Sequence, residues 1–121
     1  MKKFKVLQAI NKEYKTNDYS ITELFSLVDR TDEQYENYYI KVKQDIDKNG
    51  MKHPILLTSK QYYWGSKKWK DDNKLGVIAG SNRLRYAIEN NYTGIQGVFV
   101  KQLKEYKKIL DDTYIRVKWK Y

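Results

Sequence analysis

The sequence predicts an α+β fold in which helices pack on a small mixed β-sheet. Residues 35–46 repeat apolar side chains with the period of a helix, which indicates one buried helical face. Residues 55–58 form a short apolar run after Pro54, as is typical of a buried strand. Residues 76–89 contain an apolar run that stops at Gly80 and turns at once into a helical pattern. The 121 residues are enough for one hydrophobic core but not for two, and no Gly/Ser/Pro-rich linker divides them, so we expect one domain over residues 1–121.

The N-terminal segment is expected to form a strand, a polar loop and a short helical turn. Alternate apolar side chains place one face of residues 2–10 toward the core: Phe4, Val6 and Ile10. Residues 11–18 are polar and are expected to loop outward. Ser20 is suited to cap a turn over residues 21–24, with Glu23 at the reciprocal position of a capping box.

The clearest helix is expected to open at Thr31 or Asp32. Its apolar side chains form one stripe: Tyr35, Tyr38, Tyr39, Val42 and Ile46. Asn49 and Gly50 predict its end, because a helix C-terminus commonly needs a left-handed residue. The strand at residues 55–58 follows.

Residues 59–74 alternate rings with lysines, and we expect a hairpin with its tip near residues 65–66 or 71–73. Two interpretations stay open for this segment. It could contact nucleic acid by stacking and phosphate neutralisation, or its rings could pack on each other across a two-stranded ribbon. The candidate contact residues are Lys60, Lys67, Lys68, Lys70, Trp64 and Trp69.

A strand at residues 75–79 and a helix at residues 81–90 are expected next, with Leu84, Ala87 and Ile88 on the inner face of the helix. A strand at residues 95–100 precedes a short helix whose apolar positions are Val100, Leu103, Tyr106 and Leu110.

Strict alternation predicts a last strand at residues 113–121. Arg116, Lys118 and Lys120 would form a basic face on it. That stripe could follow a phosphate backbone, although charges that guard an edge strand are the more usual meaning.

The net charge and the residue composition limit the classes of partner and site that we expect. A net charge of +9 in 121 residues favours polyanionic partners: nucleic acid first, free nucleotide second, and acidic protein or membrane third. Among nucleic acids we favour DNA. The chain has no Cys and one His, so disulfides and thiolate sites are excluded and no metal site is expected. No apolar run reaches membrane-spanning length. We expect a cytoplasmic protein without a membrane partner, and a homodimer or a host protein as further candidate partners.

The turn at Gly80 is the candidate anion site. The first turn of a helix has backbone N–H groups without intrahelical partners, and the helix dipole adds positive potential there. Gly80 lets the backbone approach a ligand closely. Arg83 adds a planar fork of donors that suits phosphate. Ser81 and Asn82 complete the turn, and Arg85 on the same helix is a candidate nucleic-acid contact.

The ordered set of these motifs resembles the ParB N-terminal/sulfiredoxin-like superfamily, which includes small phage- and plasmid-type ParB-like nuclease domains. The matching residues run from about Ile21 to Val100: Asp45-Ile46 through Gly50, His53-Pro54-Ile55-Leu56-Leu57, Val77-Ile78-Ala79-Gly80, Arg83-Leu84, Ala87 and Asn91-Tyr92-Thr93-Gly94-Ile95. The resemblance implies a ParB/sulfiredoxin-like fold with a phosphate or nucleotide held at the Gly80 turn. It would also place Arg30 near the position of an Arg that follows Pro in partitioning proteins, although no Pro precedes it here.

The turn departs from both known patterns. Partitioning proteins read Gly-Glu-Arg-Arg and sulfiredoxins Gly-Cys-His-Arg, whereas this chain reads Gly80-Ser81-Asn82-Arg83. The last Arg matches both patterns, so its phosphate role carries over best. The missing Cys excludes sulfinic acid repair, and Ser81 and Asn82 put nucleotide hydrolysis in doubt.

Catalytic residues are not fixed by the sequence. Glu23, His53 and Ser81 are candidates, each with a structural alternative: a capping box, a surface His beside a helix end, and an N-cap. His53 is also a candidate phosphate contact. A nuclease would need a carboxylate-bound divalent ion such as Mg²⁺, for which the candidates are Glu23, Asp29, Asp32 and Glu33.

The leading hypothesis is therefore a nucleic-acid-binding ParB-like protein, phage-encoded or plasmid-encoded, with binding favoured over cleavage. The alternatives are a transferase, kinase or NTPase that uses a nucleotide triphosphate with Mg²⁺, and a phage protein that binds a host protein.

Overall fold

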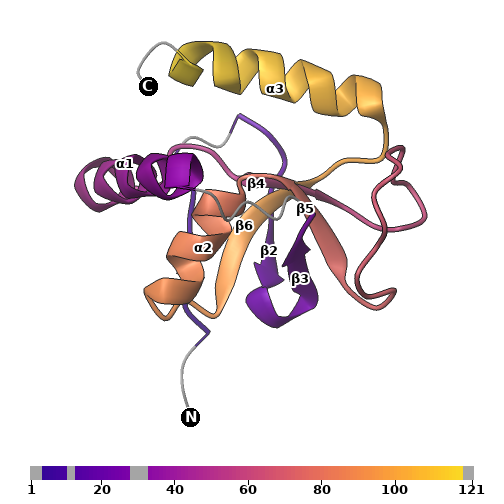
Figure 1. Cartoon of the computed structure of the whole chain (residues 1–121), viewed down its shortest axis with the longest axis horizontal. Helices are drawn as coiled ribbons and strands as arrows, with labels where there is room; N and C mark the ends of the chain where they lie inside the picture. The colour runs from indigo at the N-terminus through magenta and orange to yellow at the C-terminus, as the bar shows by residue number, and fades with distance from the viewer. Residues whose placement is uncertain (1–3, 11–12, 28–32, 119–121) are drawn as a thin grey trace.

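A six-stranded mixed sheet forms the centre of the computed structural model, which describes residues 4–10, 13–27 and 33–118 (Figure 1). Its strands are β1 (Val6–Leu7), β2 (Asn17–Ser20), β3 (Leu24–Ser26), β4 (Ile55–Thr58), β5 (Leu75–Ala79) and β6 (Gly94–Phe99). The helical elements are η1 (Ile21–Glu23), a 3₁₀ turn, and the α-helices α1 (Glu33–Asn49), α2 (Ser81–Glu89) and α3 (Leu103–Lys118). The expected α+β class with a mixed sheet is confirmed.

Strand β6 organises the sheet. Its first residue, Gly94, pairs with Val6 of β1 and Ser20 of β2, so these two strands lie on opposite sides of it. Further along, β4 runs parallel to β6 on the side of β1. Strand β5 then pairs antiparallel with β4, and β3 pairs parallel with β5. The carboxyl ends of β3 and β5 therefore meet the amino end of β4 at one edge of the sheet.

Helices cover both faces of this sheet. Tyr39 and Ile46 of α1 and Leu84 of α2 pack on one face with Ile55 and Ile95. The opposite face carries a second cluster, in which Leu56, Ile78, Val98 and Trp69 pack with Ile109 of α3. Figure 1 shows α3 and the long β4–β5 connection away from α1 and α2. Residues 59–74, which we call the β4–β5 loop, thus belong to the α3 side.

The expected helix and strand around Pro54 are confirmed. Helix α1 buries Tyr39 and Ile46 from the expected stripe, and Gly50 follows it with a φ of +77°. Strand β4 is buried along its whole length. In the described residues no helix is both long and apolar enough to cross a membrane.

The expected face of the N-terminal strand is wrong. Phe4 and Ile10 are 57% and 65% exposed, whereas Leu7 and Ala9 are buried. The side chain of Gln96 explains the register, since its Oε1 accepts the backbone N–H of Ala9 at 2.8 Å. In a strand, a shift of one residue moves every side chain to the other face.

Part of the expected polar loop is a strand. Asn17 and Asp18 belong to β2, which pairs with β6 along one edge of the sheet. Residues 11–12 lie outside the described residues. Both strand residues are exposed, so apolar periodicity gives no signal there.

The predicted hairpin is also wrong. The β4–β5 loop contains no strand in the described residues, and the strands that pair antiparallel are those flanking it, with Thr58 opposite Gly76. Tyr63, Trp64 and Trp69 of the loop pack in one apolar cluster instead of facing each other across a ribbon.

The predicted C-terminal strand is wrong as well, because α3 extends to Lys118 and residues 119–121 lie outside the described residues. A helix that has already formed grows by one hydrogen bond per added residue without new nucleation. The alternation of apolar and polar residues near the C-terminus does not outweigh the free energy gained by these hydrogen bonds.

On α2, Leu84 and Ala87 are buried as expected, but Ile88 is 53% exposed and Tyr86 is buried in its place. The Tyr86 hydroxyl donates to Asp47 of α1 at 2.6 Å, so α2 turns this ring toward its neighbouring helix.

Candidate functional site

The candidate anion site lies at the sheet edge where β3, β4 and β5 meet the start of α2. Gly80 is the single residue between the end of β5 and the start of α2. Gly80 has a φ of +96° and is the N-cap of the helix, with no side-chain hydrogen bond to the helix end. The first hydrogen bond of the helix runs from the N–H of Leu84 to the carbonyl oxygen of Gly80, at 3.0 Å. The N–H groups of residues 81–83 therefore have no partner within the helix, as an anion site requires.

Arg83 points back toward the strand beside it. Its Nη1 donates to the carbonyl oxygens of His53 and Pro54, at 2.7 and 2.6 Å. These bonds fix the extended segment that enters β4, so part of the guanidinium has a structural role. A Cβ on Gly80 would lie 3.2 Å from Arg83 Nε, which places this nitrogen close to the turn.

Ser81 lies inside the helix and is not the N-cap, which corrects its expected structural alternative. Its hydroxyl forms a 2.6 Å hydrogen bond with the hydroxyl of Ser26, the last residue of β3. Asn82 and His53 are both half-buried at the same edge. The structure thus brings together His53, Gly80, Ser81, Asn82 and Arg83.

Glu23 lies apart from this cluster. Leu24, which follows it, pairs with Leu75 at the amino end of β5, whereas Gly80 follows the carboxyl end. Five residues of strand separate these ends by roughly 16 Å. The expected capping box is absent too: Ser20 makes no cap bond, and its hydroxyl contacts that of Thr22 at 3.0 Å. Glu23 is exposed on η1.

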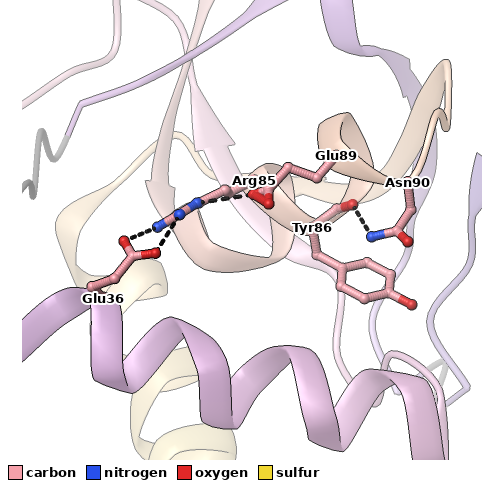
Figure 2. A network of polar contacts seen from close by, with 5 residues as sticks. All are labelled: Glu36, Arg85, Tyr86, Glu89 and Asn90. Carbon is pink, nitrogen blue, oxygen red and sulfur yellow. Dashed lines mark hydrogen bonds and ion pairs between the residues drawn. The ribbon is translucent and has the colours of Figure 1, made fainter.

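Arg85 is occupied by carboxylates (Figure 2). Nη1 and Nη2 bind the two oxygens of Glu36 on α1 at 2.8 and 2.7 Å, and Nε binds Glu89 at 3.0 Å. The guanidinium also lies 3.9 Å from the centre of the Tyr39 ring. The hydrogen bonds to Glu36 raise the pKa of Arg85 and lower that of Glu36. This residue joins α1 to α2.

Three rings of the β4–β5 loop, those of Tyr63, Trp64 and Trp69, form a connected aromatic cluster with α3. Trp69 is 8% exposed, meets Phe25 edge-on at 4.9 Å, and donates from Nε1 to Lys74 O at 3.1 Å. Tyr63 contacts Trp69 at 5.6 Å and Trp64 at 5.9 Å between ring centres. Trp69 is thus a buried support, while Trp64 is half-buried.

Tyr106 completes this cluster, with its ring centre 5.4 Å from that of Trp64. The sequence predicted Tyr106 only as an inward position of a short helix. Its role beside the β4–β5 loop was missed, because helical spacing does not reveal which distant segment a residue meets.

The basic residues of the β4–β5 loop differ in their surroundings. Lys60 binds Asp72 at 2.9 Å, and both side chains are exposed. Lys67 and Lys68 are exposed, and neither forms an ion pair with another described residue. Lys70 is exposed and already interacts with another residue. Lys67 and Lys68 are therefore the loop cations best placed to meet a partner.

The remaining predicted residues are placed only in part. The backbone of Arg116 and Lys118 is helical and belongs to α3, so these residues do not form the predicted basic face of a strand. Arg30, Asp29, Asp32 and Lys120 lie outside the described residues. Glu33 is the first residue of α1. Within the described ranges, no three His, Cys, Asp or Glu side chains gather as a metal site would require.

Comparison with known proteins identifies a structural relative. No family model and no curated protein matches this sequence. Among solved structures, the chain is similar to the C-terminally truncated chromosome-partitioning protein ParB from Caulobacter crescentus, complexed with CTP-γ-S, with a TM-score of 0.54 and 15% identity. The fold is ParB-like. The match covers 84% of this chain but 54% of that ParB chain, and at this identity it extends to the fold alone.

Proposed function

We propose that this protein binds nucleic acid, DNA in particular, through phosphate contacts made by the β4–β5 loop and by the turn at Gly80. The observation that carries the proposal is that Lys67 and Lys68 are exposed and form no ion pair with another described residue. They lie in the same loop as Tyr63, Trp64 and Trp69 of the aromatic cluster. Lysine and aromatic side chains in one surface supply the two interactions that single strands and backbones need. The net charge of +9 adds long-range attraction.

The turn supplies a second phosphate contact in this proposal. Its first helical N–H groups are free of intrahelical partners, and Gly80 presents no side chain in front of them. Arg85 has no part in the proposed contact, because Glu36 and Glu89 already neutralise it.

Salt dependence tests this proposal. Affinity for a labelled DNA oligonucleotide should fall steeply as salt rises, by about 0.9 log unit per log of salt for each duplex phosphate neutralised and about 0.7 for each single-strand phosphate. Lys67→Gln with Lys68→Gln should reduce that slope by roughly 1.4 to 1.8. The control is Lys41→Gln with Lys43→Gln, which removes the same charge from exposed positions of α1.

Two results would reject nucleic-acid binding: no complex at low salt, or affinity that is indifferent to salt. Equal salt slopes for the two double variants would show that the phosphate contacts lie outside the β4–β5 loop. Gel shifts with single- and double-stranded DNA and RNA, with and without magnesium, report cleavage in the same series.

A free nucleotide is the second candidate ligand, favoured by the Gly80 turn and by the CTP-γ-S in the ParB structure of similar fold. If ATP, CTP or GTP binds the folded state, the free energy of unfolding should rise by about 2.7 kcal/mol at 100 times the dissociation constant. A thermal-shift series with magnesium measures this gain. An unchanged melting temperature at millimolar nucleotide would eliminate this candidate.

A further inference from the structure

A shallow pocket of about 150 Å³ lies on the α3 side of the sheet, between the β4–β5 loop, β5 and α3. Six residues line it: Leu27, Tyr63, Trp64, Lys67, Ile78 and Tyr106. Three of them are aromatic, and one is a lysine without an ion pair among the described residues. The pocket is thus an aromatic surface with a positive charge at its wall.

The rings of this pocket are fixed from behind. Trp69 packs beneath Tyr63, and its own indole N–H is satisfied by Lys74 O. The Tyr106 hydroxyl donates to Ile78 O at 3.3 Å, which ties α3 to β5. Rings held in this way lose little conformational entropy when a ligand stacks on them.

We propose that this pocket receives one unstacked base of a single-stranded nucleic acid, with Lys67 on an adjacent phosphate. The inference rests on the nucleic-acid binding proposed above and adds the strandedness and the site of base contact. A paired base is enclosed in its duplex and cannot enter, whereas a single strand presents its base faces freely. The Lys67 charge beside the three rings favours a ligand that combines a stacking face with a negative charge, and a nucleic-acid strand carries both.

The ring geometry also limits how the base lies. Trp64 and Tyr106 are in direct contact, with centres 5.4 Å apart and planes inclined by 40°. A base cannot be inserted between them, so it stacks against the side of the rings that faces the pocket. Recognition of this kind depends on the π-face shared by all bases and therefore tolerates sequence.

The pocket and the Gly80 turn are close enough for one strand to occupy both. Ile78 lines the pocket, and three residues later Ser81 starts α2, which limits their Cα separation to about 11 Å. Leu27, another lining residue, directly follows Ser26, whose hydroxyl binds that of Ser81. A phosphate at the turn and a base in the pocket can thus belong to one short segment.

Abasic oligonucleotides test the inference on the unaltered protein. Fluorescence anisotropy compares a labelled ten-nucleotide single strand with a strand of the same length that lacks its bases. Both carry the same phosphates, so contacts to phosphate alone predict equal affinity. A base in the pocket predicts that the abasic strand binds roughly 5- to 150-fold more weakly, the range for one stacked base.

Variants of the pocket localise the effect. Trp64→Ala should weaken binding of the natural strand within the same range and leave the abasic strand unaffected, whereas Trp64→Phe should retain most of the affinity. Tyr62→Ala is the matched control, since Tyr62 is an exposed ring of the same loop that does not line the pocket. Thermal unfolding checks that each variant is folded.

The outcomes separate this inference from the proposed function. If no strand binds at low salt, nucleic-acid binding itself fails. If natural and abasic strands bind equally, or a folded Trp64→Ala protein keeps full affinity, the base pocket is overturned while phosphate binding stands. Should Trp64→Ala not fold, the abasic comparison on the unaltered protein decides alone.

Discussion

Gly80 combines two properties that a side chain would remove. Its φ of +96° lies in a region that residues with a Cβ rarely adopt, and a Cβ there would lie 2.8 Å from Ile55 Cγ2. Ile55 is fully buried in β4, so it cannot move aside cheaply. As an N-cap without a side chain, Gly80 also leaves the first N–H groups of α2 open to an anion. The strand–helix connection and the candidate phosphate site therefore depend on the same residue.

Gly80→Ala should lower the free energy of unfolding by about 2–3 kcal/mol, because backbone strain and contact with Ile55 add together. Urea unfolding measures the change. Gly50→Ala is the control, since Gly50 is also left-handed, with a φ of +77°, and also adjoins a helix. Its added Cβ would meet only the Cδ1 and Cγ1 atoms of the exposed Ile10 side chain, so a smaller loss of about 1–2 kcal/mol is expected. Equal losses would show that contact with Ile55 adds nothing.

At the level of elements, the segments with strong local signals are the ones that sequence predicts correctly. Helix α1, the buried strand β4 and the strand–Gly80–helix turn each have a periodicity or a turn residue of their own. Strand β2 has none, because an exposed edge strand needs only backbone pairing with β6. The alternation near residue 116 was misleading because a helix begun at Leu103 continues through it.

The candidate site shows the same division. The turn at Gly80 is local and could be predicted, but the partners of Arg83 could not, since the carbonyls of His53 and Pro54 are distant in sequence. The aromatic cluster needs the β4–β5 loop and α3 to meet, which only the folded sheet brings about. Side-chain type indicated the chemistry of the loop, while tertiary packing decided which rings are supports and which remain accessible.

Across the whole molecule, ion pairs and lysines without an ion pair to a described residue occur on both sides of the sheet. On the α1–α2 side, Arg85 is held by Glu36 and Glu89, and Lys52 lies 3.5 Å from Asp45. On the α3 side, Lys67 and Lys68 have no ion pair with a described residue. Lys41 and Lys43 of α1 are likewise exposed and form no ion pair with a described residue, so charge alone does not separate the two sides. The α3 side differs in the aromatic residues that lie beside Lys67, which agrees with a polyanion partner there.

Two tyrosines on the α1–α2 side should make global stability sensitive to alkaline pH. Burial raises the pKa of Tyr39 to about 12, with the nearby Glu89 carboxylate adding to it. The hydrogen bond to Asp47 raises the pKa of Tyr86 to about 12, with burial adding to it. In the unfolded chain tyrosine ionises near pH 10. Between about pH 10 and 12 the unfolded state therefore binds fewer protons than the folded state, and the free energy of unfolding falls as pH rises.

The contribution of these two hydroxyls should be complete below about pH 10 and lost as pH rises through about 12. Urea unfolding from pH 8 to 12 measures it for the unaltered protein and for Tyr39→Phe with Tyr86→Phe. Each profile is referred to its own value at pH 8, which removes the cost of the lost hydrogen bond. Lysine deprotonation occurs in both proteins and cancels in the comparison. The double variant should show the shallower decline, because neither phenylalanine can release a proton on unfolding; parallel profiles would mean that the two tyrosines do not resist ionisation in the fold.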